Sequence, residues 1–204
     1  MKVGVIDYGM GNLHSVSKAL EHAGAAHVEL IEQPERLKEF DRVVLPGVGA
    51  MGACVDAIRQ AGFDQALAEY VQHRPMLGVC VGMQALFENG DENGGVDGLG
   101  WFHGHVNHFH PDIRAQGLKI PHMGWNQVQH NQHPLFDGIA QDERFYFVHS
   151  FRVSDSAEAI ARADHGGEFV AAVGRDNVVA TQFHPEKSQH AGLQLYANFL
   201  KWMP

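Results

Sequence analysis

Cysteine is scarce in this sequence of 204 residues, which contains only Cys54 and Cys80. Two cysteines cannot form the disulfide framework on which small secreted proteins depend. Residues 2–6 are strand-like, whereas a secretory signal would place a charged segment and a longer apolar run at this position. We therefore expect a protein of the reducing cytoplasm.

Basic residues are also few, with 15 lysines and arginines against 24 acidic residues and a formal net charge of -9. Nucleic-acid binding normally requires a basic face, so this class of function is excluded. Apolar runs of the length of a membrane span are absent as well, which argues against a membrane protein. The length and the 45% hydrophobic content predict one domain over residues 1–204.

Strand-like and helix-like segments alternate through the first 80 residues. Strands are expected at 2–6, 27–31, 42–45 and 76–79, and helices at 12–23, 34–40 and 51–61, with Gly24 and Gly62 ending two of the helices. This alternation predicts an α/β fold with a mostly parallel central sheet flanked by helices. Ligands of such sheets bind at the carboxyl ends of the strands.

The pattern changes after residue 100 to short segments that predict antiparallel hairpins added to this sheet. These segments are 101–109, 125–129, 145–153, 169–173 and 178–183, of which the last two are joined by a turn at 175–177. Residues 189–202 predict a closing helix.

Cys80 lies within Gly78-Val79-Cys80-Val81-Gly82, between an apolar strand and a helix-like stretch. Glycines flank the nucleophile of hydrolases in the same way, because the sharp strand-to-helix turn leaves no room for side chains. A helix N-terminus would favour the thiolate. The pentapeptide alone is more often typical of a small buried core cysteine than of a nucleophile, and a small core residue is also the interpretation that we favour for Cys54.

His184 and Glu186 follow the last predicted strand and supply what a catalytic thiol needs. An imidazole accepts the thiol proton, and a carboxylate fixes the imidazole tautomer. Spacing of two residues on an extended segment points both side chains the same way, and Pro185 stiffens the backbone between them. A Cys80 elbow and a His-x-Glu motif, both at the ends of predicted strands, favour cysteine catalysis over two unrelated core features.

Two glycine-rich loops are candidate binding sites. Residues 9–14 fall short of a dinucleotide fingerprint, because His14 stands where the third glycine is needed. Residues 46–50, Pro-Gly-Val-Gly-Ala, could bind phosphate at a helix N-terminus, or could form an oxyanion site in which a backbone N–H faces the charge. A tight turn without function would use the same glycines.

Fifteen histidines are many for this length, and His103, His105, His108 and His110 lie in one segment. On a strand the first two share one face and the last two share the other, so the four cannot converge on a metal without a bulge. We therefore expect surface histidines on a hairpin.

Taken together, the motifs resemble the class I, triad-type glutamine amidotransferases. The family is marked by residues 78–84, GVCVGMQ, and residues 182–186, QFHPE. More narrowly, the sequence resembles the glutaminase subunits of imidazole glycerol phosphate synthase. The segments that carry this resemblance are DYGMGNL at 7–13, PGVGA at 46–50, PHMGWN at 121–126, YFVHS at 146–150 and HPEKS at 184–188. Two departures are Met51, where an aromatic residue is expected, and the histidine-rich segment His103–His110.

The resemblance implies that the Cys80 thiolate attacks the side-chain amide of glutamine and forms a glutamyl thioester. His184 would protonate the leaving ammonia and then activate water, and Glu186 would orient His184. An oxyanion site would use the N–H of Val81 and the Val48–Gly49 peptide. The family pattern assigns the glutamine pocket to Gln84, Glu92, His149 and Ser150, and it requires no metal or organic cofactor.

The resemblance also implies a partner, a barrel-shaped cyclase bound as a heterodimer, which receives the ammonia through a shielded path. Positions similar to the family's interface are Asn12, Tyr146 and Lys187. The flexible Pro-Gly-x-Gly sequence suggests the hypothesis that the partner's ligand turns the Val48–Gly49 peptide into its oxyanion-binding form.

Two other functions stay open from the sequence. The chain could be the glutaminase of another amidotransferase, such as the one that serves pyridoxal phosphate synthesis, although the segments 46–50 and 121–126 do not favour it. It could also be a catalytically silent scaffold for a partner, against which the intact triad argues.

Overall fold

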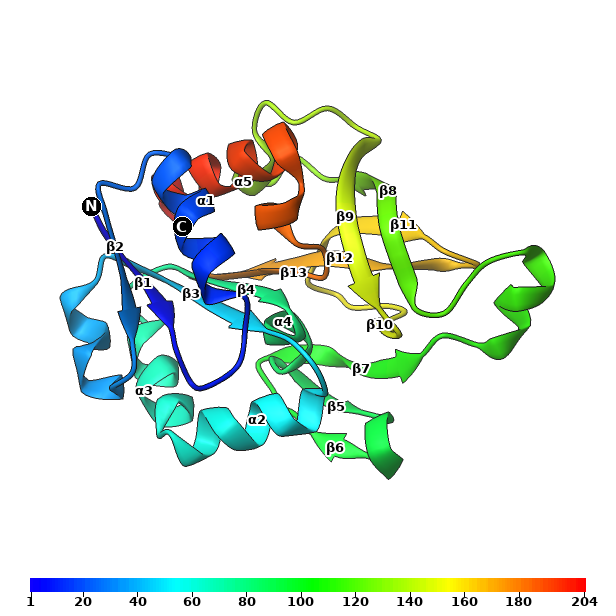
Figure 1. Ribbon diagram of the computed structural model, residues 1–204, viewed down its shortest axis with the longest axis horizontal. Helices are drawn as coiled ribbons and strands as arrows, with labels where there is room; N and C mark the ends of the chain where they lie inside the picture. The colour runs from blue at the N-terminus through cyan, green and yellow to red at the C-terminus, as the bar shows by residue number, and fades with distance from the viewer.

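A computed structural model describes all residues, 1–204 (Figure 1). The centre of the molecule is a nine-stranded sheet in the order β2-β1-β3-β4-β13-β12-β11-β8-β9. Its parallel half consists of β2 (His27–Ile31), β1 (Lys2–Ile6), β3 (Arg42–Gly47), β4 (Met76–Cys80) and β13 (Val178–Thr181). Four of these strands are buried along most or all of their length, as expected where helices cover both faces.

The sheet continues as the predicted antiparallel hairpins. These strands are β12 (Glu168–Arg175), β11 (Ala159–Asp164), β8 (His122–His130) and β9 (Glu143–His149). Of these, β11 was not predicted from the sequence. The α/β fold with helices on both faces and added hairpins is confirmed.

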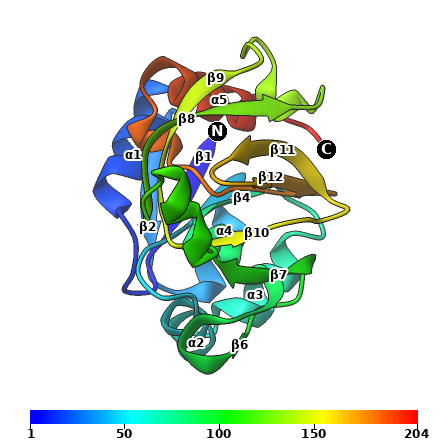
Figure 2. The ribbon, with the colours of Figure 1, turned by 90° about the vertical axis from the view of Figure 1, so that its right-hand side faces the viewer.

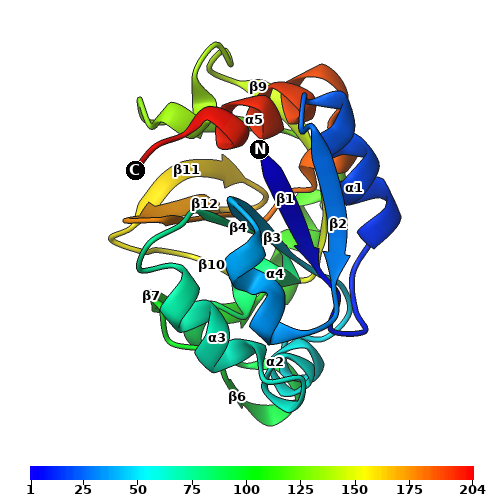
Figure 3. The same ribbon diagram turned by 90° about the vertical axis from the view of Figure 1, so that its left-hand side faces the viewer.

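Helices cover both faces of the sheet. On one face lie α1 (Leu13–His22) and α5 (Gln189–Lys201), and on the other lie α2 (Met51–Gln60), α3 (Phe63–Tyr70) and the short α4 (Val81–Gln84) (Figures 1 and 3). Gly24 and Gly62 follow the ends of α1 and α2 with φ angles of 108° and 74°, which confirms their predicted role. No helix in residues 1–204 is both long and apolar enough to cross a membrane.

One prediction for the second half is wrong, because residues 101–109 do not extend the central sheet. They form β7 (Phe102–His108) in a separate four-stranded sheet with β10 (Phe151–Val153), β5 (Phe87–Gly90) and β6 (Val96–Asp97) (Figure 2). The predicted segment 145–153 divides at Ser150 between the two sheets. The chain therefore crosses from one sheet to the other beside the end of β4.

Short 3-10 helices replace or interrupt some predicted elements. Residues predicted as the helix 34–40 form η1 (Pro34–Glu39), and four further turns are η2 (Glu92–Gly94), η3 (Pro111–Gln116), η4 (Pro134–Phe136) and η5 (Pro185–Lys187). The turn η5 follows His184 directly.

Candidate active site

Cys80 is the last residue of β4 and precedes α4 directly, as the sequence predicted. Its φ and ψ angles are 55° and -112°, a conformation that a residue with a side chain adopts only under strain. Strain of this kind is typical of a nucleophile elbow. The sequence pattern therefore predicted the backbone at Cys80 correctly.

Two glycines allow the neighbouring strand to approach this elbow. A Cβ atom at Gly82 would overlap the carbonyl oxygen of Leu45, and one at Gly47 would overlap the backbone of Gly82. The end of β3 thus packs directly on the turn after Cys80. The predicted helix follows Cys80 directly, but α4 has only four residues, so its dipole is weak.

His184 and Glu186 form a buried pair, with Nδ1 of His184 2.7 Å from Oε1 of Glu186. Only 3% and 1% of their side-chain surfaces are exposed. The contact agrees with the prediction, but the predicted extended backbone is wrong. β13 ends at Thr181, and Glu186 lies in the 3-10 turn η5. Proline at the first position of this turn favours the helical φ angle, and Ser188 Oγ donates to the His184 carbonyl.

The surroundings of His184 favour its cationic form. Burial lowers its pKa, but hydrogen bonding and charge interactions with Cys80 and Glu186 outweigh burial and raise the pKa of His184 to about 10. The second ring nitrogen, Nε2, has no partner with hydrogen-bond geometry and is left for Cys80. A cationic imidazole between a thiol and a carboxylate is the arrangement of a cysteine nucleophile with its acid-base group.

A residue that the sequence did not single out, Tyr196 of α5, lies behind this pair. Burial first, and then the Glu186 carboxylate, raise the pKa of Tyr196 well above its usual value, so the phenol keeps its proton. The Tyr196 hydroxyl and Oε2 of Glu186 are both buried, and neither forms a hydrogen bond within the chain. Because Tyr196 sits in a helix that closes the core, its sequence context is that of an ordinary buried aromatic.

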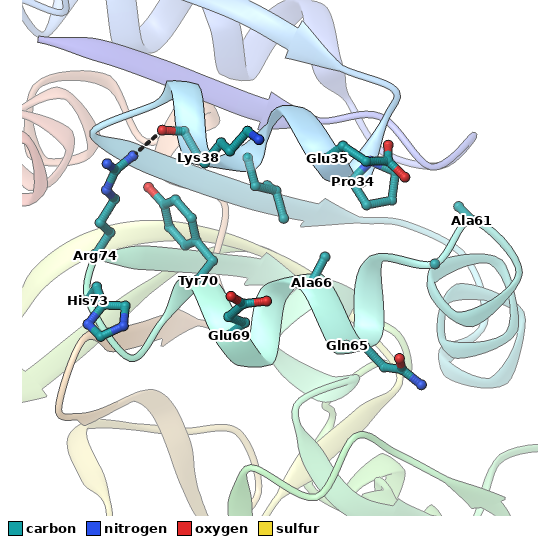
Figure 4. Close-up of a pocket in the computed structure, with 12 residues that line it drawn as sticks. Pro34, Glu35, Lys38, Ala61, Gln65, Ala66, Glu69, Tyr70, His73 and Arg74 are labelled. Carbon is teal, nitrogen blue, oxygen red and sulfur yellow. Dashed lines mark hydrogen bonds between the residues drawn. The ribbon is translucent and has the colours of Figure 1, made fainter.

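Cys80 and His184 open into one cavity of about 400 Å³. Its lining brings together segments that are far apart in the sequence: Val48, Gly49, Cys80, Val81, Gln84, Glu92, Pro121, Val148, His149, Ser150, Phe151, His184 and Lys187. All predicted oxyanion and glutamine-pocket residues are among them. A larger cavity, of about 840 Å³, lies between η1 and α3, where Arg74 donates to the Lys38 carbonyl (Figure 4). It contains no predicted site residue.

Val48 and Gly49 of the loop 48–50 line the cavity and carry free backbone donors. Neither Val48 N–H nor Gly49 N–H has a hydrogen bond within the chain. The Val48 carbonyl accepts from the Cys54 thiol, with Sγ to O at 3.3 Å, and Gly49 has a φ angle of 83°. Cys54 is thus buried, as predicted, but it also contacts the loop. Carbonyl and N–H point in opposite directions across a trans peptide, so the Gly49 N–H points away from Cys54.

Gln84 and Glu92 are held by neighbouring residues at the cavity wall. Gln84 Nε2 donates to the Phe151 carbonyl at 3.2 Å and to Gln182 Oε1 at 2.9 Å. Glu92 Oε2 accepts from Met51 N–H, with N to O at 2.5 Å, at the first turn of α2. Glu92 therefore ties the cavity wall to the residue that follows the oxyanion loop.

Gln182 is a further residue at the site to which the sequence assigned no role. Its Nε2 atom lies 3.9 Å from Cys80 Sγ, and its side chain is completely buried. Cys80 Sγ in turn lies 4.0 Å from the Val148 carbonyl oxygen. Gln182 belongs to the motif QFHPE at 182–186, but neither this motif nor its apolar surroundings indicated a contact with Cys80.

Two of the three predicted interface residues gather at the rim of the cavity. Lys187 Nζ lies 5.8 Å from the ring centroid of Tyr146, and the Tyr146 ring packs edge-on against Trp125 at 6.0 Å. Trp125 and Met123 on β8 are 43% and 62% exposed. The third residue, Asn12, stands at the start of α1, which packs against η5.

The histidines of residues 103–110 are exposed, as predicted. His105 contacts Asn89 and Asp91, and His103 contacts Glu158. No group of three or more histidine, cysteine, aspartate or glutamate residues in the chain is arranged to hold a metal ion.

Comparisons with known proteins agree with this geometry. The family model described as "Glutamine amidotransferase class-I" matches residues 4–202. The chain is 50% identical to the protein named imidazole glycerol phosphate synthase subunit HisH of Acinetobacter baylyi, with 98% of each chain covered. It is 51% identical to the HisH of Pseudomonas syringae pv. syringae, over 98% of this chain and 97% of that one.

Solved structures agree at the level of the fold. A structure of PurLQS from Thermotoga maritima has a TM-score of 0.75 with 20% identity, and covers 98% of this chain and 97% of that one. A crystal structure of a glutamine amidotransferase has a TM-score of 0.74 with 19% identity over the same shares.

Proposed function

Since the chain belongs to the class I glutamine amidotransferases and, within them, to the HisH subunits of imidazole glycerol phosphate synthase, we propose that it hydrolyses glutamine and supplies the ammonia to a cyclase partner. The observation that carries the proposal is the joint opening of Cys80 and His184 into one cavity lined by free backbone donors. The single apolar core, in which 57 buried residues form one cluster, supports treating residues 1–204 as one domain.

The reaction begins at Cys80. Its thiolate attacks the side-chain amide carbon of glutamine, and the charge that develops on the amide oxygen is held by N–H groups of Val81 and of the Val48–Gly49 peptide. His184, held cationic by its neighbours, donates a proton to the departing nitrogen. Ammonia leaves, and a glutamyl thioester remains on Cys80.

The second half of the reaction uses the same residues in the opposite direction. His184, now neutral, removes a proton from a water molecule, which attacks the thioester and releases glutamate. Glu186 keeps Nδ1 protonated and Nε2 directed at the reacting atoms. Gln84, Glu92, His149 and Ser150 form the wall that holds glutamine.

The rim of the cavity is the proposed docking face for the cyclase. Met123 and Trp125 are exposed apolar side chains beside Tyr146 and Lys187, and exposed aromatic residues at a cavity mouth favour a protein interface. Docking over the cavity would let ammonia pass to the partner without mixing with solvent. The partner would use it to form imidazole glycerol phosphate and an aminoimidazole carboxamide nucleotide.

The proposal is tested by product formation from a mixture of this chain and the cyclase. We expect product with glutamine as nitrogen source only when both chains are present, and product with ammonium from the cyclase alone. Trp125→Ala should weaken the complex, whereas Leu30→Ala, which removes a side chain of similar exposure on the opposite edge strand β2, should not. Equal binding by both variants would contradict the proposed docking face.

The alternative of a silent scaffold predicts a different result. A scaffold would stimulate the cyclase with ammonium but release no glutamate from glutamine.

A further inference from the structure

Two buried histidines meet at the cavity wall, one of which, His149, lines the cavity, while the other, His122, lies behind it. His122 of β8 and His149 at the end of β9 are cross-strand partners, and only 4% and 6% of their surfaces are exposed. The Nδ1 atom of His122 lies 2.8 Å from Nε2 of His149. Neither His122 nor this contact has a role in the chemistry proposed for Cys80.

The proton positions in this pair follow from the groups at its two ends. His149 Nδ1 lies 2.7 Å from the Phe151 carbonyl, which can only accept, so His149 donates there and Nε2 is the acceptor. His122 Nδ1 must therefore carry the shared proton. At the other end, Asn126 Nδ2 donates to the Asp164 carbonyl at 2.7 Å and to His122 Nε2 at 3.2 Å. Both ends require the same tautomers.

The result is a chain of hydrogen bonds that all point the same way: Asn126 donates to His122, His122 donates to His149, and His149 donates to the Phe151 carbonyl. In this directed chain both imidazoles are neutral, and both nitrogens of each ring are hydrogen-bonded. A further proton on either ring would place two N–H groups against each other. Burial, followed by neighbouring histidine charges, lowers the pKa of each ring to about 3. The titratable groups that face the pair are basic, namely His165 stacked on His122 at 4.1 Å, Arg152 and His184.

The directed chain of hydrogen bonds connects two surfaces that have different proposed functions. Pro121, which precedes His122, and residues 149–151 line the cavity, and the adjacent Val148 carbonyl faces Cys80. On the other side of β8, Met123 and Trp125 are exposed. His122 and Asn126 therefore lie between the proposed docking face and the wall of the glutamine pocket.

We propose that His122 and Asn126 are positioning residues, which hold the wall formed by His149, Ser150 and Phe151 in the shape that binds glutamine. The inference rests on the proposed glutaminase function. It assigns to His122 an effect on glutamine binding rather than on the triad, because no atom of His122 contacts Cys80 or His184. A movement of β8 on docking would reach the pocket through the same hydrogen bonds.

Substitution of His122 by phenylalanine tests this assignment. His122→Phe keeps a planar ring against Phe147 and His165. It leaves His149 Nε2 without a donor and removes one of the two acceptors of Asn126 Nδ2, whose bond to the Asp164 carbonyl remains. We expect KM for glutamine to rise about ten-fold, with kcat at saturating glutamine and the alkylation rate of Cys80 changed by less than about three-fold.

His130→Phe is the matched control. His130 lies on the same strand, stacks on Phe136 and hydrogen-bonds two carbonyl groups, but does not line the cavity. A KM within two-fold of the wild type in His122→Phe, or an equal rise in His130→Phe, would overturn the inference. If His122→Phe fails to fold, Asn126→Ala provides a second test. Asn126 is half-buried and is the first donor of the hydrogen-bond chain, so its removal should also raise KM for glutamine, but less than His122→Phe does.

Ring ¹⁵N chemical shifts provide a measurement that does not depend on activity. At pH 6 both rings should be neutral with the proton on Nδ1, and a cationic ring or an Nε2 proton on either would refute the directed chain. If the wild type releases no glutamate, the proposed function fails, while the NMR result still tests the hydrogen-bond chain.

Discussion

His184 and Glu186 are two residues apart, and their Nδ1 and Oε1 atoms are 2.7 Å apart inside the protein, with both side chains almost fully buried. A carboxylate at this distance keeps the proton on Nδ1 and stabilises the imidazolium. The other ring nitrogen is thereby left for Cys80. The activity of the protein depends on this contact and on the cavity into which Cys80 and His184 open.

The first prediction concerns Glu186→Gln. The pKa of His184 is raised by Cys80 and Glu186, so removal of the carboxylate charge should lower it. The alkaline limb of the pH profile of kcat/KM, where His184 loses its proton, should move to lower pH, and kcat should fall by at least about ten-fold. A profile that keeps its alkaline limb in place would show that Glu186 does not control the charge of His184.

The second prediction concerns Tyr196, whose hydroxyl faces Oε2 of Glu186. Tyr196→Phe should lower kcat by roughly three- to ten-fold, because the Glu186 carboxylate loses the buried polar hydroxyl beside it and can rotate. Tyr70→Phe is the control, since Tyr70 is a buried tyrosine that bonds the Phe40 carbonyl away from the cavity. An equal loss of kcat in both variants would indicate damage to the core instead.

The third prediction separates the two cysteines. Cys80→Ala should reduce glutamate release by at least about a thousand-fold, because Cys80 is the only cysteine that lines the cavity. Cys54→Ala should retain activity within about five-fold, since a thiol is only a weak donor to the Val48 carbonyl. Comparable losses in the two variants would move the catalytic role away from Cys80.

The fourth prediction is a loss of stability in acid. Folded His122 and His149 have pKa values lowered to about 3, whereas a histidine in the unfolded chain titrates near the ordinary pKa of 6.5. The unfolded chain thus binds more protons between these values. Their contribution to the free energy of unfolding is present above pH 6.5 and should fall by about 1.4 kcal/mol per pH unit for each ring as the pH decreases toward 3.

Urea unfolding at pH 7 and pH 5 measures this dependence. The difference between the two pH values should be smaller in His122→Phe, which removes one of the two rings. A difference that is the same in the variant and the wild type would contradict the neutral, buried state of His122.

Much of the fold and of the site followed from the sequence because those features are local. The strand at residues 76–80, the strained turn at Cys80 and the contact of His184 with Glu186 depend on neighbours in the chain. Glycines at 78 and 82 leave room for neighbouring groups to approach this turn closely, and the proline at 185 fixes its own φ angle. The parallel half of the sheet followed from the alternation of strands and helices.

Features that depend on pairing between distant segments were not predictable in this way. Residues 102–108 alternate like any hairpin strand, and only their pairing with residues 87–90 places them in a second sheet. His122 and His149 are 27 residues apart, so nothing in either local pattern indicates that their rings meet. Gln182 and Tyr196 look like buried core residues until the fold brings them to Cys80 and Glu186.

Glutamate release from glutamine is the most direct test of the central claim, that the Cys80 site is a glutaminase which works with a cyclase partner. It should be measured with this chain alone, with the cyclase, and with the cyclase and its ribulosyl nucleotide ligand. We predict weak release from the chain alone and a sharp increase when both partner and ligand are present, because the free N–H groups of Val48 and Gly49 must be aligned with the oxyanion. Full activity of the isolated chain, unchanged by the cyclase, would contradict this account.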